Sequence, residues 1–194
     1  MSIDSASAYD HHAKAFLRAR DQSNIGADVV AQWCHTLGKD AQVLELACGG
    51  GYPITRVLHE AGMRLWAIES SPSLVAEFQR RFPDVPVQCA KVQDSDFFGR
   101  NFDAVVAVGL MFLLSETDQA ALIHRVAQVL SPGGRFLFTA PLQSCQWVDL
   151  ITGIPSHALG RTAYEKNFHS AGLSLIATYT DSGANHYYEA QRIA

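Results

Sequence analysis

The stretch that decides the fold is VLELACGGGYPI, residues 43–54. Its first part, residues 43–47, is apolar except for Glu45 and predicts a short buried strand. Glycines follow, and Pro53 then suits the first turn of a helix. In open α/β sheets a glycine-rich turn between a strand and a helix lies at the ligand site, where the backbone approaches the bound molecule closely. The stretch therefore predicts a ligand-binding α/β domain.

The same alternation of strand and helix continues outward from this stretch. Helices are expected at residues 9–20 and 25–37, from Ser71-Pro72, from Ser115 to Leu130 and at 161–171, and strands at 65–68, 85–89, 102–108, 135–140, 173–179 and 186–191. The last two strands are joined by a tight polar turn. Strand–helix alternation predicts an α/β fold, a Rossmann-like three-layer sandwich whose seven-stranded, mostly parallel sheet ends in an antiparallel C-terminal hairpin strand.

Composition restricts the function classes further. The chain has 194 residues, 48% of them hydrophobic and 18% charged, which suits a single globular domain spanning 1–194. A net charge of −4 gives no basic footprint for nucleic acid, and no apolar stretch is long enough to cross a membrane. The polar first ten residues do not resemble a signal peptide, and the four scattered cysteines suit reduced thiols in a cytoplasm. No metal-ligand spacing is present, so no metal is expected.

Details of the glycine-rich stretch separate the possible ligands. The dinucleotide fingerprint requires a third glycine, and Ile54 stands at that position. Glu45 lies inside the strand before the glycines, where a pyrophosphate would be repelled. Glu69, at the end of the next strand, can accept hydrogen bonds from ribose hydroxyls. These features favour a cationic, phosphate-free nucleoside over a dinucleotide.

Four segments in this order resemble class I S-adenosylmethionine-dependent methyltransferases. Residues 43–51 resemble the first motif of that family, with Ala47 where the family usually has its first glycine. Residues 68–72 resemble the acidic second motif, 101–106 the strand leading into the fourth, and 130–134 the loop before the fifth strand. The resemblance covers roughly residues 42–141. It implies S-adenosyl-L-methionine as cofactor, S-adenosyl-L-homocysteine as product, and no metal.

The resemblance also implies a division of the chain and a cofactor site. Residues 1–40 would form a helical lid, 41–141 the cofactor-binding half and 142–194 the acceptor side. The expected cofactor-binding residues are Tyr9, Glu45, Ala47, Cys48, Gly49, Gly51, Glu69, Ser70, Val92, Gln93, Val108 and Gly109. The family commonly has an acid against the adenine amine, and here both Gln93 and Asp94 are open for that place.

The acceptor is expected to be a small molecule. The segment after residue 108 lacks the motif of amino-directed nucleic-acid methyltransferases, and the Pro-Cys nucleophile of cytosine-carbon methylation is absent too. If the last strand runs antiparallel, His186 begins it at the cofactor end and is a candidate general base. The candidate acceptor-site residues are Phe112, Trp147, His157, Tyr164, Asn185 and Tyr188. The alternatives are a cofactor-binding sensor or assembly protein and, third, an NAD-dependent oxidoreductase.

Overall fold

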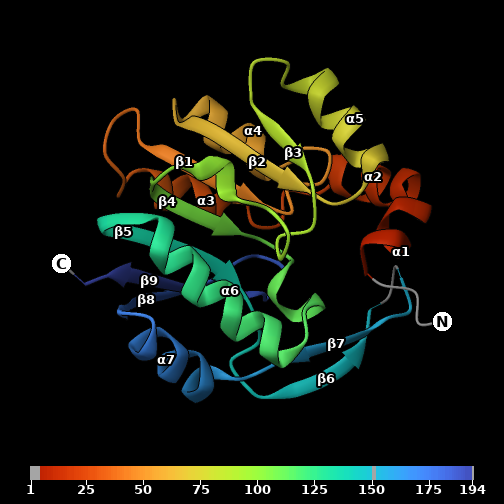
Figure 1. The fold of residues 1–194 in the computed structure, drawn as a ribbon. Helices are drawn as coiled ribbons and strands as arrows, with labels where there is room; N and C mark the ends of the chain where they lie inside the picture. Colours follow the sequence, from red (N-terminus) through yellow and green to blue (C-terminus); the bar gives the residue numbers. More distant parts are fainter. Residues whose placement is uncertain (1–4, 150–151, 194) are drawn as a thin grey trace.

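The computed structural model describes residues 5–149 and 152–193 and contains one large twisted sheet (Figure 1). The strands of this sheet are β1 (Gln42–Leu46), β2 (Arg64–Glu69), β3 (Val87–Cys89), β4 (Phe102–Ala107), β5 (Leu130–Thr139), β8 (Leu173–Thr180) and β9 (His186–Arg192). Their order is β3-β2-β1-β4-β5-β9-β8. Strand β9 runs opposite to all the other strands of the sheet, which are parallel to one another. The predicted seven-stranded, mostly parallel sheet is confirmed.

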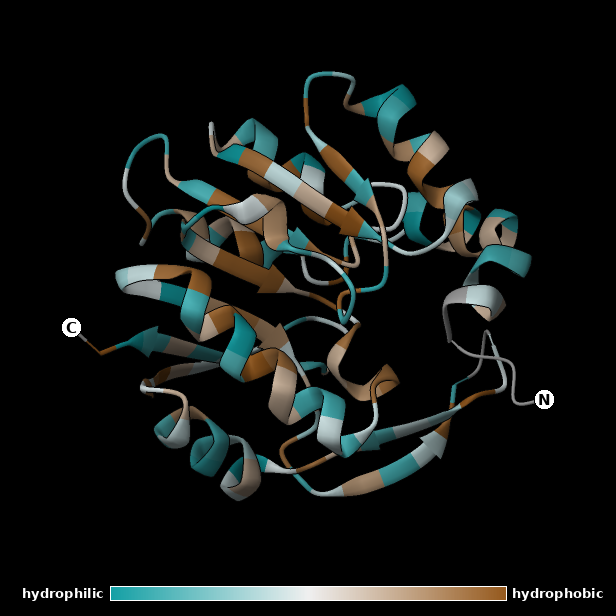
Figure 2. Ribbon diagram, viewed as in Figure 1, coloured by the Kyte–Doolittle hydropathy of each residue, from teal (hydrophilic) through white to brown (hydrophobic). Residues whose placement is uncertain are grey.

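Helices cover both faces of this sheet, as the three-layer prediction requires. The side chains of α3 (Ala27–Cys34), α4 (Ile54–Glu60) and α5 (Pro72–Arg81) form one apolar cluster with one face of the central strands. Those of α6 (Glu116–Val129) and α7 (Arg161–Ser170) form a second cluster with the opposite face. Figure 2 shows the apolar residues concentrated along the central strands, with hydrophilic residues on the helices around them.

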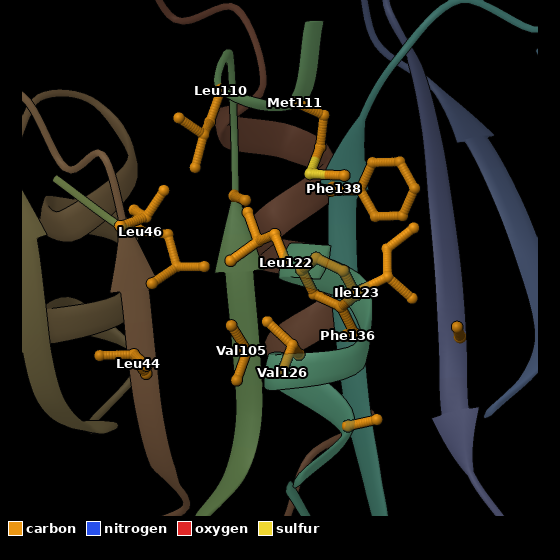
Figure 3. Close-up of a cluster of buried hydrophobic side chains, with 14 of the residues drawn as sticks. Leu44, Leu46, Val105, Leu110, Met111, Leu122, Ile123, Val126, Phe136 and Phe138 are labelled. Atoms are coloured by element: carbon orange, nitrogen blue, oxygen red, sulfur yellow. The ribbon is translucent and has the colours of Figure 1, made fainter. Parts of the chain in front are cut away.

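The second cluster shows why the central strands read as continuous apolar runs. Leu44 and Leu46 of β1, Val105 of β4 and Phe136 and Phe138 of β5 point toward the same side, where α6 packs on them (Figure 3). The neighbouring residues Val43, Ala104, Val106 and Leu137 of these strands belong to the other cluster. A strand buried on both faces has no polar alternation, so its sequence signal is strong.

Side-chain caps begin the two helices where the sequence predicts them. Ser71 accepts a hydrogen bond from the backbone N–H of Leu74, 3.2 Å away, at the start of α5. Ser115 accepts one from Asp118, 3.1 Å away, at the start of α6. Each cap satisfies a backbone donor that the first helical turn leaves unpaired.

Two regions differ from the sequence-based prediction. The single helix expected at residues 9–20 is two helices, α1 (Ser5–His11) and α2 (Ala13–Asp21), with a break at His12. The strand expected from residue 135 begins at Leu130, and the Ser131–Gly134 segment bulges from the pairing with β4. Both halves contact α5 (Pro72–Arg81), α1 at its start through Asp10 and α2 at its end through Asp21.

A small hairpin stands apart from the main sheet and was not predicted. Its strands are β6 (Cys145–Val148) and β7 (Pro155–Ala158), which lie below the main sheet in Figure 1 and carry the chain toward α1. The 3-10 turns η1 (Phe97–Gly99) and η2 (Met111–Leu113) complete the fold, and β7 packs on η2. Within residues 5–149 and 152–193, no helix has the length and apolarity that crossing a membrane requires.

Candidate active site

Two cavities open where the parallel strands β1, β2 and β4 end. The smaller has a volume of about 100 Å³ and the larger about 270 Å³. Both are lined by Ala47, Glu69, Ser70 and Leu110, so they meet at the end of β2. The ligand site of an open α/β sheet lies at this edge, next to the switch in strand order. Here the switch falls between β1 and β4.

Glu69 stands at the junction of the two cavities. Its carboxylate accepts hydrogen bonds from the backbone N–H groups of Gly49 and Ser71, each 2.9 Å away. These bonds tie the end of β2 to the glycine-rich turn and fix the direction of the carboxylate. Burial raises the pKa of Glu69, although the two N–H donors oppose the shift. The Glu69 carboxylate is therefore held rigidly, and it can accept further hydrogen bonds from a molecule bound in the cavities that it lines.

Glu45 lines the larger cavity from inside β1. The hydroxyl of Thr55 donates a hydrogen bond to the Glu45 carboxyl at 2.6 Å, and Glu45 is 4% exposed. Burial raises the pKa of Glu45 to about 8, against the opposing effect of Thr55 and of the nearby Arg20 guanidinium. Arg20, from α2, lines the same cavity. This end of the cavity thus carries a carboxyl group and a guanidinium together.

The raised pKa of Glu45 predicts that stability depends on pH. Because the folded protein holds this proton more tightly than the unfolded chain, the contribution of Glu45 is complete only below about pH 4.5 and is lost as the pH rises to about 8. Glu45→Gln should therefore gain stability relative to the wild type between pH 5 and 8, by up to about 1.4 kcal/mol per pH unit. Urea unfolding at both pH values measures this difference. The exposed Glu60→Gln change is the control, and an equal pH slope in all three proteins would contradict the prediction.

The glycine-rich turn serves packing as well as ligand access. A Cβ atom on Gly50 would lie 2.2 Å from the terminal methyl group of Leu17 of α2, so the leucine side chain would have to shift. The neighbouring Gly49 is covered in the same way by Phe16 of α2. The prediction that Gly49 and Gly51 contact the cofactor stays a prediction. In the structure the missing side chains of Gly49 and Gly50 also leave room for the N-terminal helix α2.

Ala47 and Cys48 lie between β1 and the glycines. Ala47 has a φ of 56°, in the left-handed region that favours glycine, which explains the glycine expected at this place in the family. The Cys48 thiol lines the larger cavity, and burial beside Glu45 and Glu69 raises its pKa well above the ordinary value. A thiol that stays protonated is a packing group here and a poor nucleophile.

The smaller cavity ends at the loop after β3. Val92 and Gln93 line it, together with Leu110 and Leu114 from the segment after β4. Arg125 of α6 donates hydrogen bonds to the carbonyl groups of this loop, at 2.5 Å to Val92 and 3.0 Å to Gln93. The loop is therefore fixed, and it forms one wall of the smaller cavity.

The N-terminal helices close the larger cavity. Asp10 of α1 accepts hydrogen bonds from the Ser71 hydroxyl (2.5 Å) and the Ser73 N–H (3.0 Å), at the start of α5. The hydroxyl of Tyr9 then lies 3.5 Å from Oδ2 of Asp149, at the end of β6. The larger cavity is thus bounded by α1 on one side and by the β6–β7 hairpin on the other.

Most of the predicted cofactor residues line these cavities. Those that do are Tyr9, Glu45, Ala47, Cys48, Glu69, Ser70, Val92, Gln93, Val108 and Gly109. Gly49 and Gly51 lie behind the lining, where Gly49 donates to Glu69. Residues that the sequence did not single out also line the larger cavity, among them Phe16, Arg20, Tyr52 and Asp149.

The predicted acceptor residues are brought together less fully. Phe112 lines the larger cavity and Trp147 packs on it, with ring centres 5.2 Å apart. The other predicted groups, which do not line either cavity, are His157, Tyr164, Asn185, His186 and Tyr188. Their polar atoms mostly have structural partners. Tyr164 donates to Gln119 at 2.7 Å, and Nδ1 of His186 lies 3.1 Å from the Thr180 hydroxyl.

No metal centre accompanies these cavities in the part of the chain that the structure describes. Within residues 5–149 and 152–193, no group of three or more His, Cys, Asp and Glu side chains is placed to hold a metal ion.

The fold and the site define a Rossmann-like domain with a nucleoside-type pocket at the carboxyl edge of its sheet. A family model described as "Methyltransferase domain" matches residues 43–134, the segment that contains the glycine-rich turn and most of the residues that line the two cavities. Over this segment the chain is similar to methyltransferase domains, and its fold is that of class I S-adenosylmethionine-dependent methyltransferases.

Several proteins that are similar to this chain in sequence or in structure are methyltransferases. A trans-aconitate 2-methyltransferase from Escherichia coli O157:H7 is 27% identical over 154 residues, which are 76% of this chain and 53% of that protein. The chain thus spans about half the length of the curated relatives it matches. Among solved structures, the 1,6-didemethyltoxoflavin-N1-methyltransferase of Burkholderia thailandensis has a TM-score of 0.73 at 16% identity, covering 100% of this chain and 93% of that one. An amino pentose methyltransferase from Micromonospora echinaspora has a TM-score of 0.73 at 18% identity, covering 92% and 95%.

Proposed function

We propose that this chain transfers a methyl group from S-adenosyl-L-methionine to a small-molecule acceptor. The observation that supports this most directly is the pair of cavities that meet at Glu69. A nucleoside joined to an amino acid needs two neighbouring spaces, one flat and apolar and the other larger and polar. The second space must also admit the acceptor, because the methyl group has to reach it.

The smaller cavity suits the nucleoside half of this cofactor. The Glu69 carboxylate would accept hydrogen bonds from the ribose hydroxyls, and its rigid hold by Gly49 and Ser71 limits the entropic cost of binding. Val92 would pack against the adenine ring, and Gln93 would accept from the adenine amine. This cofactor contains no pyrophosphate, so its binding does not bring phosphate groups next to the acidic residues Glu45 and Glu69.

The inner end of the larger cavity suits the amino-acid half. A free amino acid carries an ammonium and a carboxylate group on the same carbon. The Arg20 guanidinium could pair with the carboxylate, and the Glu45 carboxyl could accept a hydrogen bond from the ammonium group. The relatives and structural neighbours named above are methyltransferases, which is in line with this use of the site.

The bound cofactor supplies an activated methyl group on a sulfonium centre. The task left to this chain is to hold the acceptor in line with that group and to exclude water. Tyr9 and Phe16 do so from the N-terminal helices, and Phe112 from the far wall. In this proposal residues 1–40 form a lid, residues 41–141 bind the cofactor, and residues 142–194 form the acceptor side. His186 stays a prediction, and the proposed transfer does not depend on it.

The test is formation of S-adenosyl-L-homocysteine. The protein is incubated with S-adenosyl-L-methionine and a panel of small acceptors, and the demethylated product is quantified by mass spectrometry. We expect product to form with at least one class of acceptor and in proportion to enzyme. Binding of the cofactor without product from any acceptor would instead support the cofactor-binding sensor.

A further inference from the structure

Helix α2 forms one wall of the larger cavity but buries little apolar surface. Phe16 and Arg20 of this helix line the cavity. Of residues 13–21, all of which the structure describes, Ala13 alone is buried. Phe16 and Leu17 pack on the glycine-rich turn, where two neighbouring glycines leave room for them. A segment with so few buried apolar contacts separates easily from the body of a protein unless polar contacts hold it.

Arg81, the last residue of α5, makes such a polar contact. Its guanidinium forms a bidentate ion pair with Asp21, the last residue of α2, with nitrogen–oxygen distances of 2.7 and 2.8 Å. The side chain of Arg81 is 8% exposed and that of Asp21 is 37% exposed. Fully exposed ion pairs stabilise a protein little, whereas a bidentate pair with a buried guanidinium is stronger and fixed in direction. The pair therefore ties the end of α2 to α5.

The same guanidinium also holds the glycine-rich turn and a residue that lines the cavity. Its Nη1 atom donates to the carbonyl of Gly50 at 3.2 Å, and its Nε atom donates to Glu77 of α5 at 2.6 Å. The guanidinium carbon lies 4.4 Å from the ring centre of Tyr52, and Tyr52 lines the larger cavity. One buried cation thus joins α2, α5 and the glycine-rich turn at the edge of the larger cavity.

We propose that Arg81 is a positioning residue for cofactor binding, which keeps α2 over the larger cavity through its ion pair with Asp21. This inference rests on the proposed function. Both residues lie outside the lining of the two cavities, so they act on the cofactor only through α2. When the ion pair is broken, α2 moves away from the glycine-rich turn and takes Phe16 and Arg20 with it. A bound S-adenosyl nucleoside then dissociates faster, because its amino-acid half loses the wall that covers it.

Asp21→Asn is the variant that isolates the ion pair. It removes the charge of a partly exposed residue, keeps the size of the side chain and leaves the other contacts of Arg81 in place. The matched control is Asp84→Asn, at an exposed aspartate outside the lining residues of both cavities. Arg81→Lys keeps the positive charge but loses the planar fork, and it is studied alone and combined with Asp21→Asn.

Hydrogen exchange followed by mass spectrometry reports on α2 without any ligand. The backbone amides of residues 13–21 should exchange at least about fivefold faster in Asp21→Asn than in the wild type and in Asp84→Asn. Exchange in β1 should be the same in all three proteins, because the sheet is not affected. Equal exchange of α2 in the wild type and Asp21→Asn would overturn the proposal.

The dissociation rate of S-adenosyl-L-homocysteine, measured by surface plasmon resonance, reports on the cofactor site. It should be at least about fivefold faster in Asp21→Asn and in Arg81→Lys than in the wild type, and unchanged in Asp84→Asn. The double variant should release the nucleoside no faster than Arg81→Lys, since both changes break the same ion pair.

Two results of this measurement would overturn the proposal. One is an unchanged dissociation rate in Asp21→Asn, and the other is a double variant in which the two effects multiply fully. Failure of the wild type to bind S-adenosyl-L-homocysteine would instead refute the proposed function, and hydrogen exchange would still decide whether Arg81 holds α2 in place.

Discussion

Glu69→Ala is expected to weaken the binding of S-adenosyl-L-methionine by at least about a hundredfold. The variant removes the acceptor for the ribose hydroxyls, and each hydrogen bond to a charged group contributes about 1.5–3 kcal/mol. It also leaves the N–H groups of Gly49 and Ser71 without their partner, so the glycine-rich turn loses its tie to β2. Isothermal titration with the cofactor and with its demethylated product measures the effect.

Two comparisons make the Glu69 result interpretable. Glu69→Gln keeps the size of the side chain and one carbonyl acceptor, so it should bind more weakly than the wild type and better than Glu69→Ala. Glu60→Gln, on an exposed helical position, should bind normally. Circular dichroism establishes that each variant is folded. An affinity within about threefold of the wild type in folded Glu69→Ala would remove Glu69 from the cofactor site.

Gly51→Ala is expected to destabilise the fold by about 3 kcal/mol. A Cβ atom at Gly51 would lie 2.3 Å from the ring of Phe82, and the backbone φ of +91° is unfavourable for any other residue. The ring of Phe82 cannot move away freely, because Phe78 and Tyr52 pack on it with ring centres 5.4 and 6.0 Å away. The loss of stability is measured by urea unfolding.

Gly62→Ala separates the two causes of the Gly51 effect. Gly62 has a similar φ of +78°, but no heavy atom lies within 4 Å of the place of its Cβ. Its substitution should therefore cost only the backbone strain, about 1 kcal/mol. If both variants lose the same stability, the clash with Phe82 has no energetic effect and the packing described for this turn is wrong.

The central part of the fold could be predicted because each element carries its own local signal. The strands around residues 43–46 and 102–107 are apolar runs interrupted only by Glu45 and Asp103, and Ser71 and Ser115 mark helix starts that the structure confirms. Glu69 could also be predicted as a ribose-binding residue, because an acid at the end of the strand that follows the glycine-rich turn can be recognised in the sequence itself. These signals need no knowledge of tertiary contacts.

The acceptor side could not be predicted in the same way. The β6–β7 hairpin is mostly exposed and lacks the alternation of apolar and polar residues that indicates a strand. Arg20 and Asp149 are isolated charged residues on a helix and a turn, and only the docking of α2 and of the hairpin brings them to the cavity. His186 looked favourable from strand direction alone, which does not define where a side chain packs.

The most direct test of the account is calorimetric titration of the wild-type protein with S-adenosyl-L-methionine, S-adenosyl-L-homocysteine and NAD. The account predicts that both sulfur-containing nucleosides bind at one site per chain and that NAD does not compete with them. It rests on Glu45 inside β1, on Ile54 in place of a third glycine, and on the carboxylate of Glu69 between the two cavities. Binding of NAD with no binding of either sulfur-containing nucleoside would contradict it.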